Sequence, residues 1–277
     1  MNIIELLRWG EVQLKASGIA DPRLDADLLL GRVLGFPRER LYLEREWVVP
    51  EAGQARYGAL VARRAGREPL QYILSEQEFM GLRFYVDERV LIPRADTEIL
   101  AEQFLQQVSK GDGLGLKVLD LCTGSGVLAI MAAYYRPGLQ VTGVDLSSEA
   151  LEVARFNGER IGARVDWRQG DFLQPVQGET WDWILTNPPY VSLDEYRECA
   201  PEISFEPRQA LLGGEDGLDF YRRLAHEAPP LLKPAGKMLV EIGWLQGEAV
   251  NAMLRNAGFE TEIMLDLGGR DRVILAR

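Results

Sequence analysis

Strand-like and helix-like patterns alternate from about residue 116 onward, and this alternation constrains the fold more than any other feature. Short apolar runs are followed by stretches with apolar residues at helical spacing. The expected strands cover residues 117–121, 139–144, 164–169, 181–186, 237–242, 259–264 and 272–276, and the expected helices cover 126–135, 148–160, 217–231 and 246–256. Repeated βα units predict an α/β fold with a doubly wound, mostly parallel sheet, whose ligands bind beyond the carboxyl ends of its strands. The last two strands have no helix between them, so one of them is expected to be antiparallel.

The chain before this region has two other patterns. Residues 1–70 carry apolar residues at helical spacing, for example Leu24, Leu28 and Leu29, and predict a small helical N-terminal domain. Residues 71–93 change to short β-like runs around Gly81 and predict a β-hairpin linker. The third part, 94–277, contains the repeated βα units and is expected to form the second domain. Residues 1–85 hold equal numbers of basic and acidic side chains, so the net charge of −11 belongs to the remainder of the chain.

Composition excludes several classes of protein. Apolar residues make up 47% of the chain, which is ordinary for a globular protein with a core. No apolar run reaches the roughly 18–20 residues of a membrane span, and the first residues do not resemble a signal peptide. Two cysteines and one histidine do not suffice for a Cys/His metal cluster or a disulfide framework. We therefore expect a cytoplasmic protein without a metal, and the acidic C-terminal part lowers the expectation of nucleic-acid binding.

A glycine-containing loop follows the first expected strand of the α/β region. Its residues are Cys122, Thr123, Gly124, Ser125 and Gly126. Glycines let the backbone approach a ligand closely, but the loop lacks the third glycine of a dinucleotide motif and is compatible with several nucleosides. Asp145 ends the next strand, where a carboxylate can accept both ribose hydroxyls. Asp171 and Phe172 end the third strand and offer an acceptor for an adenine amine and an aromatic face.

Asn187, Pro188, Pro189 and Tyr190 follow the fourth expected strand of this region. Two prolines hold the turn stiff, because each restricts φ and lacks an N–H group. The Asn187 side-chain oxygen and a neighbouring backbone carbonyl would then provide two acceptors for one planar NH2 group. Tyr190 adds a flat face and a hydroxyl. A Pro-Pro pair alone is also typical of an ordinary turn. The glycine loop and the two strand-end acids favour a binding site over an ordinary turn here.

This series of motifs resembles the class I methyltransferase fold, in which S-adenosylmethionine lies across the first four strands. Asn-Pro-Pro-Tyr resembles the motif of enzymes that methylate an NH2 group conjugated to a π-system, such as adenine N6, guanine N2 or a glutamine amide. The lone pair of such a nitrogen is delocalised, so it is a poor nucleophile. Two acceptors on its N–H groups would position it and stabilise the positive charge that develops during attack.

Nearly the whole chain resembles one family, the HemK-type (PrmC) enzymes that methylate the glutamine of a Gly-Gly-Gln loop in peptide chain release factors. The segments that carry the resemblance are the N-terminal helices, 69–73, 91–98, 120–126, 187–190 and 205–211. Cys122 stands where the family usually has glycine, and Ala95 where it usually has proline. We expect the cysteine to be tolerated with a negative φ at position 122.

The resemblance implies roles for residues of this chain. Residues Cys122 to Gly126, Asp145, Asp171 and Phe172 would line the S-adenosylmethionine site, with S-adenosylhomocysteine as the product. Asn187 and the Pro188 carbonyl would hold the target amide, and Tyr190 would pack against it. Asn187 would also border the cofactor. The connection 191–216 is long enough to carry function, and its Phe205 and Glu206, together with Pro189, would shape the groove for the substrate loop.

Two other functions remain compatible with the motifs. A nucleic-acid amino-methyltransferase acting on adenine or guanine would use the same Asn-Pro-Pro-Tyr pocket for a flipped base, and it would need a basic groove. A non-catalytic module that binds S-adenosylmethionine would dock to a partner through its helical domain. Arg94 is compatible with a substrate contact or with a structural role between linker and core.

Overall fold

The computed structural model describes residues 1–109, 111 and 114–277, and the chain divides into two compact units. The first unit comprises Met1–Glu76 and Ala200–Phe205, and the second comprises Gln77–Cys199 and Glu206–Arg277. A short segment from the middle of the 191–216 connection therefore belongs to the helical unit. The two units are described separately below.

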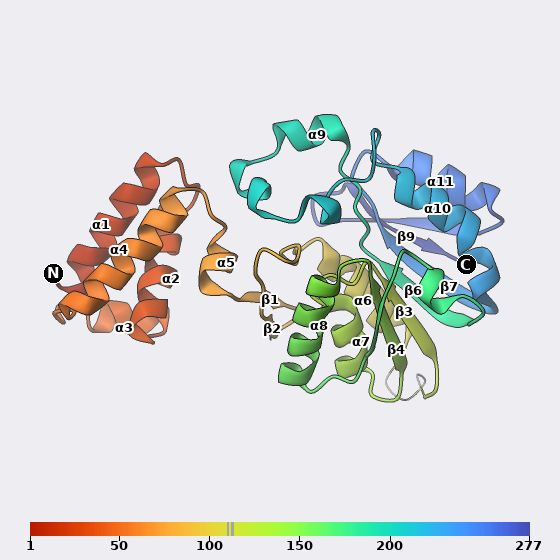
Figure 1. Cartoon of the computed structure of the whole chain (residues 1–277), viewed down its shortest axis with the longest axis horizontal. Helices are drawn as coiled ribbons and strands as arrows, with labels where there is room; N and C mark the ends of the chain where they lie inside the picture. The colour runs from red at the N-terminus through yellow and green to blue at the C-terminus, as the bar shows by residue number, and fades with distance from the viewer. Residues whose placement is uncertain (110, 112–113) are drawn as a thin grey trace. The chain divides into compact units, whose positions relative to one another are not determined.

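The first unit is a helical bundle, whose residues 1–76 run from red to orange in Figure 1. Its helices are α1 (Ile3–Ala16), α2 (Pro22–Leu34), α3 (Arg38–Leu43), α4 (Glu51–Ala65) and α5 (Leu70–Leu74), with the 3-10 helix η2 (Pro201–Phe205) in the added segment. Asn2 and Glu5 form a capping box that starts α1. Gly35 ends α2 with a φ of 66°, a conformation that favours glycine.

A buried ion pair lies inside this bundle. Arg64 on α4 contacts Asp25 on α2 at 2.7 Å, and both side chains are about nine-tenths buried. Arg64 also contacts Glu202 of η2 at 3.1 Å, and Arg67 contacts the same carboxylate at 2.6 Å. These contacts bind the segment 200–205 to the helical unit.

The second unit contains the expected sheet. Among the described residues its strands are β1 (Gln77–Phe79), β2 (Leu82–Phe84), β3 (Lys117–Leu121), β4 (Gln140–Asp145), β5 (Asp166–Gln169), β6 (Trp181–Thr186), β7 (Leu232–Glu241), β8 (Thr261–Leu265) and β9 (Asp271–Ala276). β1 and β2 form a hairpin, and the others form one sheet in the order β5-β4-β3-β6-β7-β9-β8. β9 is antiparallel to both β7 and β8, and the remaining pairs are parallel. The prediction of a doubly wound, mostly parallel sheet is confirmed.

Helices cover both faces of this sheet (Figure 1). The longer helices of the unit are α6 (Thr97–Gln107), α7 (Val127–Tyr135), α8 (Ser148–Ile161), α10 (Asp219–Glu227) and α11 (Gly247–Asn256). Shorter elements in the loops are η1 (Gln174–Val176), α9 (Leu193–Glu198), η3 (Arg208–Ala210) and η4 (Pro229–Leu231). One core cluster joins α6 and α7 to the sheet, and a second cluster joins α10 and α11 to the opposite face.

The hairpin β1–β2 is part of the first of these clusters. Phe79 and Phe84 are almost fully buried and pack edge to face with ring centroids 6.2 Å apart. The backbone N–H of Met80 donates to Glu98 on α6 at 2.6 Å, and its carbonyl accepts from Tyr135 on α7 at 2.5 Å. The hairpin is thus packed into the core of the α/β unit, and the division between units falls after residue 76.

Candidate active site

A cavity of about 240 Å³ lies at the carboxyl ends of β3, β4, β5 and β6. The predicted site residues that line it are Cys122, Thr123, Gly124, Ser125, Asp145, Asp171, Phe172, Asn187 and Pro189. Parallel strands end at the same edge of a sheet, so residues that are distant in sequence meet there. The loop after β3 and the turn after β6 therefore face the same space.

The loop after β3 has an unusual backbone. Gly124 and Gly126 have φ angles of 54° and 85°, and Cys122 has a φ of 58°. The negative φ that would let a cysteine be tolerated at position 122 is therefore not present. A side chain at that φ brings Cβ close to the following carbonyl, which costs about 1–2 kcal/mol. Gly126 has a packing role, because a Cβ there would lie 2.9 Å from the ring of Trp167 and 3.1 Å from Ala154.

Asp145 is placed as the ribose-binding prediction requires, at the end of β4 and on the cavity wall. Its Oδ2 accepts the backbone N–H of Gly124 and its Oδ1 accepts that of Ser147, both at 2.9 Å. These bonds orient the carboxylate and leave further lone pairs for hydroxyl donors. Burial raises the pKa of Asp145 despite these bonds.

Asp120, which sequence reasoning did not single out as a site residue, lies deeper in the same cavity. Its Oδ2 accepts the Thr123 hydroxyl and the backbone N–H of Ala129. Its Oδ1 is buried and has no hydrogen-bond partner within the described part of the chain. Burial raises the pKa of Asp120 to about 7. An unpaired carboxylate oxygen on a cavity wall suits a ligand that carries a hydrogen-bond donor or a positive charge.

Asp171 and Phe172 share a partner on α10. Arg223 forms two hydrogen bonds with the Asp171 carboxylate, at 3.0 and 3.1 Å, and its guanidinium lies 4.5 Å from the centre of the Phe172 ring. Phe172 also contacts Phe220 edge to face. Arg223 and Phe220 line the cavity as well. They belong to a helix that the sequence predicts, although nothing in its local pattern indicates a ligand.

Some residues of the Asn-Pro-Pro-Tyr turn line the cavity, and the others are packed in the interior. Asn187 and Pro189 line the cavity, and Asn187 Nδ2 donates to Thr97 Oγ1 at 3.0 Å. Pro188 is buried. Tyr190 packs against the core cluster of α10 and α11, and its hydroxyl donates to Glu241 Oε1 at 3.4 Å. Burial raises the pKa of Tyr190.

Among the described residues the cavity lining leaves out Gly126, Pro188, Tyr190, Phe205 and Glu206. Phe205 belongs to the helical unit and is 40% exposed. Glu206 is 5% exposed and accepts the backbone N–H of Ile92 at 3.0 Å and Arg94 at 2.5 Å. Arg94 thus joins the 91–94 segment to the long connection. The cavity-lining residues of that connection are Pro207, Gln209 and Ala210.

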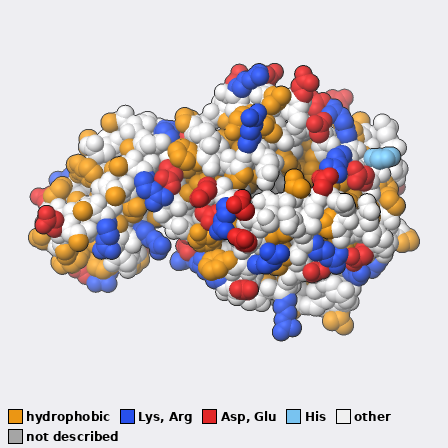
Figure 2. Space-filling model, in the orientation of Figure 1, with side chains coloured by type: hydrophobic (Ala, Val, Ile, Leu, Met, Phe, Trp, Pro, Cys, Tyr) orange, Lys and Arg blue, Asp and Glu red, His pale blue; other side chains and the backbone are white. Residues whose placement is uncertain are grey.

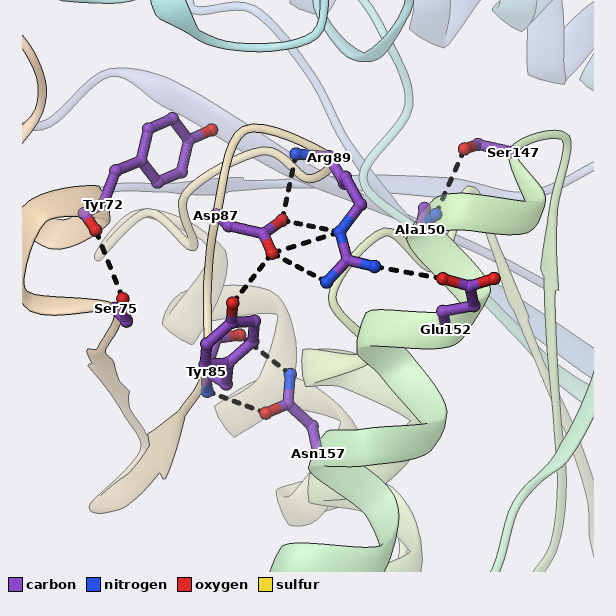
Figure 3. Close-up of polar contacts among 9 residues, drawn as sticks. All are labelled: Tyr72, Ser75, Tyr85, Asp87, Arg89, Ser147, Ala150, Glu152 and Asn157. Carbon is purple, nitrogen blue, oxygen red and sulfur yellow. Dashed lines mark hydrogen bonds and ion pairs between the residues drawn. The ribbon is translucent and has the colours of Figure 1, made fainter.

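A strap formed by residues 85–93 lines part of the cavity. Figure 3 shows the polar contacts between this strap and α8. Asn157 on α8 binds both the backbone N–H and the carbonyl of Tyr85, at 2.7 and 3.0 Å. Asp87 accepts the Tyr85 hydroxyl and pairs with Arg89 at 2.7 Å. Arg89 then contacts Glu152 on α8 at 3.0 Å and lines the cavity. The strap is therefore bound to α8 by side chains that only the folded chain brings together.

The comparisons with known proteins agree with this geometry. The model of the PrmC N-terminal domain matches residues 5–74, and that of the methyltransferase small domain matches residues 95–211. A curated "Release factor glutamine methyltransferase" of Geobacter sulfurreducens is 41% identical over 278 residues, covering 100% of this chain and 96% of that protein. The enzyme of the same name from Moorella thermoacetica is 40% identical, with coverages of 100% and 98%.

The chain belongs to this family. The resemblance to HemK-type (PrmC) enzymes is thus confirmed, and the protein is a methyltransferase that uses S-adenosylmethionine. A methyltransferase from Pyrococcus furiosus shares its fold, with 20% identity, a TM-score of 0.55 and coverage of 72% of this chain and 89% of that chain. The catalytic domain of human Mettl16 does so at 15% identity and a TM-score of 0.56, with coverages of 78% and 81%.

The residues of the cavity fit the cofactor of a release factor glutamine methyltransferase. Asp145 offers a carboxylate to a ribose, Phe172 an aromatic face, and Asp120 an unpaired buried oxygen. In the described ranges, side chains of His, Cys, Asp and Glu do not gather in a group of three or more that would suit a metal ion. No helix within the described ranges is long and apolar enough to cross a membrane.

Proposed function

We propose that this protein transfers a methyl group from S-adenosylmethionine to the side-chain amide nitrogen, N5, of the glutamine in the Gly-Gly-Gln loop of peptide chain release factors. The observation that carries the proposal is the meeting of Asp145, Phe172 and Asn187 in one cavity, in a chain of this family. S-adenosylhomocysteine is the second product. A cytoplasmic location is part of the same proposal, because release factors act at the ribosome.

We assign the cofactor to Cys122 to Ser125, Asp145, Asp171 and Phe172. S-adenosylmethionine supplies an activated methyl group on a sulfonium when it is bound. Asn187 Oδ1 and the Pro188 carbonyl accept the two N–H groups of the target amide, which positions its nitrogen and stabilises the positive charge that grows on it. Pro189, on the cavity wall, limits where the amide can lie. Tyr190 acts from behind the turn, through its packing and its contact with Glu241.

Asn187 is the residue on which this mechanism depends. Asn187→Ala should lower kcat/KM by roughly 10²–10³-fold, the effect of removing one preorganised transition-state partner. Asn187→Asp keeps an acceptor at nearly the same place and should retain part of the activity. The measurement is single-turnover methyl transfer at saturating S-adenosylmethionine. Equal rates for alanine and wild type would show that Asn187 is only a turn residue.

The substrate is tested by mass spectrometry of a release factor incubated with the enzyme and S-adenosylmethionine. One added methyl group on the loop glutamine is expected, and a release factor with that glutamine replaced by alanine is the control. Methylation of RNA or DNA with no methylation of the release factor would favour the nucleic-acid alternative. Acidic and basic side chains are intermixed on the face shown in Figure 2, which suits a protein partner better than a phosphate backbone.

We also propose that residues 1–70 dock the release factor and that 94–277 are the catalytic part. The 71–93 linker between them packs its hairpin on the α/β unit and contributes residues to the cavity wall. Leu43 and Val48 support this, since they are 85% and 67% exposed on the helical unit. Replacing both by serine should raise KM for the release factor at least about 10-fold, because each apolar side chain buried in the complex contributes about 1.5–3 kcal/mol. Neither kcat nor cofactor affinity should change. Leu267→Ser, at an exposed leucine of the second unit, is the matched control.

A further inference from the structure

Asn157 on α8 holds two separate backbone segments with one side chain. Its Oδ1 accepts the backbone N–H of Tyr85 at 2.7 Å, and its Nδ2 donates to the Tyr85 carbonyl at 3.0 Å (Figure 3). The same Nδ2 donates to the Ser125 carbonyl at 3.0 Å. The Asn157 side chain is fully buried, and it lies outside the group of described residues that line the cavity. Asn157 can therefore affect the cavity only through the segments that it binds.

Both of these segments form walls of the cavity. Tyr85 begins the strap, and the strap residues that line the cavity are Arg89, Val90, Leu91 and Pro93. Ser125 belongs to the loop after β3 and lines the cavity together with residues 122–124. One buried amide thus fixes the strap relative to the loop, at the place to which we assign the cofactor.

The Ser125 carbonyl needs Asn157 because of how α7 begins. Ser125 is 3% exposed and stands two residues before the first residue of α7. In a regular helix its carbonyl would accept the N–H of Ala129, four residues later. That N–H is bound instead to Asp120 Oδ2 at 3.0 Å. A buried carbonyl without a partner is unfavourable, and Asn157 Nδ2 supplies the partner.

Asparagine suits this position by its hydrogen bonds and not by its shape alone. The NH2 group has two hydrogens, one for each carbonyl, and the side-chain oxygen accepts the N–H. An aspartate would place an oxygen against two carbonyl oxygens. A leucine has nearly the same size and branching but forms none of these bonds. Replacement of Asn157 by leucine therefore separates hydrogen bonding from the filling of space.

The other attachment of the strap to α8 is weaker. Arg89 contacts Glu152 at 3.0 Å, but the two side chains are 30% and 65% exposed. An ion pair that water reaches contributes little, because both charges are solvated when it opens. The bonds to Asn157 are buried and include both backbone groups of Tyr85. They are therefore the bonds that determine where the strap lies.

We propose that Asn157 is a positioning residue for the cofactor, because it holds the strap and the loop after β3 in the arrangement that binds S-adenosylmethionine. The proposal rests on the proposed function, which assigns the cofactor to this cavity. Without the amide, the two walls adopt the binding arrangement for only part of the time. The apparent affinity of a ligand falls in proportion to that fraction, whereas a saturating concentration of the ligand restores the arrangement.

The test measures cofactor binding and turnover in Asn157→Ala and Asn157→Leu. Both variants should weaken S-adenosylmethionine binding in calorimetry at least about 10-fold, the effect of one or more lost hydrogen bonds. At saturating S-adenosylmethionine the single-turnover rate should change less than about 3-fold. Unchanged cofactor affinity in the leucine variant would show that the side chain only fills space, and would overturn the proposal.

Asp182→Ala is the matched control for a loss of stability. Asp182 accepts the backbone N–H of Lys117 at 2.8 Å and pairs with Lys233 at 2.6 Å. These bonds lie at the amino ends of β3 and β6, whereas the cavity lies at the carboxyl ends. The control should unfold at a lower urea concentration than wild type and keep its affinity for S-adenosylmethionine. An equal loss of affinity in the control and in the Asn157 variants would overturn the proposal.

Hydrogen exchange of the wild-type protein without cofactor gives a second test, which does not depend on whether the variants fold. The Tyr85 amide should exchange far more slowly than an amide of an open loop, because its hydrogen lies in the buried bond to Asn157. Fast exchange would show that the strap is not held, and would overturn the proposal. In Asn157→Ala, exchange should increase in 85–91 and 122–126. A purely structural role would increase it throughout the sheet.

The experiments also separate this proposal from the assignment of the cofactor to the cavity. If Asp145→Ala and Asn157→Ala both bind S-adenosylmethionine like wild type, the assignment fails. If Asp145→Ala binds it more weakly and Asn157→Ala binds it like wild type, the positioning role fails and the assignment stands. The binding measurement contains no release factor, so a negative methylation assay would refute the proposed substrate without changing this result.

Discussion

Replacing Glu241 by glutamine should change how the stability of the protein depends on pH. Glu241 is fully buried, and its Oε2 has no hydrogen-bond partner among the described residues. Burial raises its pKa from the usual 4.5 to about 7, although Thr97, Arg272 and Tyr190 favour the charged form. Glutamine has nearly the same shape and can still accept the Tyr190 hydrogen, but it does not titrate.

The sign of the effect follows from the raised pKa. The native state binds the Glu241 proton more tightly than the unfolded state does, so the proton stabilises the native state at low pH. That contribution is fully present below the unfolded pKa and is lost as the pH rises through about 7. With 1.36 kcal/mol per pKa unit, the loss between about pH 5 and about pH 8 is roughly 2–3 kcal/mol. Glu241→Gln should not show this loss.

The measurement is urea unfolding of both proteins at several pH values, followed by tryptophan fluorescence. Trp181 and Trp183 lie on β6, next to β7, and report on this part of the sheet. The free energy of unfolding of Glu241→Gln, minus that of wild type, should rise by roughly 2–3 kcal/mol from the lower to the higher pH. A difference in the free energy of unfolding that is the same at every pH does not affect this test. Glu262→Gln, at an exposed position on β8, controls for the loss of one carboxyl group. Parallel pH profiles for Glu241→Gln and wild type would refute the reasoning.

Three other substitutions test separate parts of the structure. Asp145→Ala should weaken S-adenosylmethionine binding by about 1.5–3 kcal/mol, as for hydrogen bonds to a charged group, and calorimetry with unchanged affinity would remove Asp145 from the site. Cys122→Gly should raise the free energy of unfolding by about 1 kcal/mol, because glycine adopts a φ of 58° without strain; thermal unfolding at or below the wild-type midpoint would contradict this. Asp25→Ala should destabilise the helical unit by about 3–5 kcal/mol, because Arg64 would lose its buried partner. Circular dichroism during urea unfolding would measure that change, and a loss below about 1 kcal/mol would show that Glu202 alone compensates Arg64.

The sequence by itself determined the strands, the helices and the approximate place of the site. The strands 117–121 and 181–186 were predicted with the bounds that the structure has, because a buried strand produces a local apolar pattern. The edge at which they end also follows from the pattern, since βα units make neighbouring strands parallel. Asp145 and Asn187 could therefore be placed on one cavity without any knowledge of tertiary contacts.

The tertiary structure decided which way the side chains at that edge point and what they contact. Tyr190 was expected beside the target amide, but it packs on the core and contacts Glu241, 51 positions away. Glu206 was expected in the substrate groove, but it is buried against Ile92 and Arg94. Asp171 pairs with Arg223, and Asn187 donates to Thr97 on α6. Such contacts join residues that are far apart in sequence, so no local pattern records them.

The backbone conformation of the loop after β3 also depends on contacts between residues that are far apart in sequence. A cysteine at position 122 gives no local reason to expect a φ of 58°. The conformation is imposed from both sides: Thr123 N–H is bound to the carbonyl of Val144, and Gly124 N–H is bound to Asp145. Both partners lie on or at the end of β4, whose place beside β3 exists only in the folded sheet. Local sequence periodicity specifies the elements and their order, whereas the conformation of the loops between them depends on hydrogen bonds that form after the elements have packed.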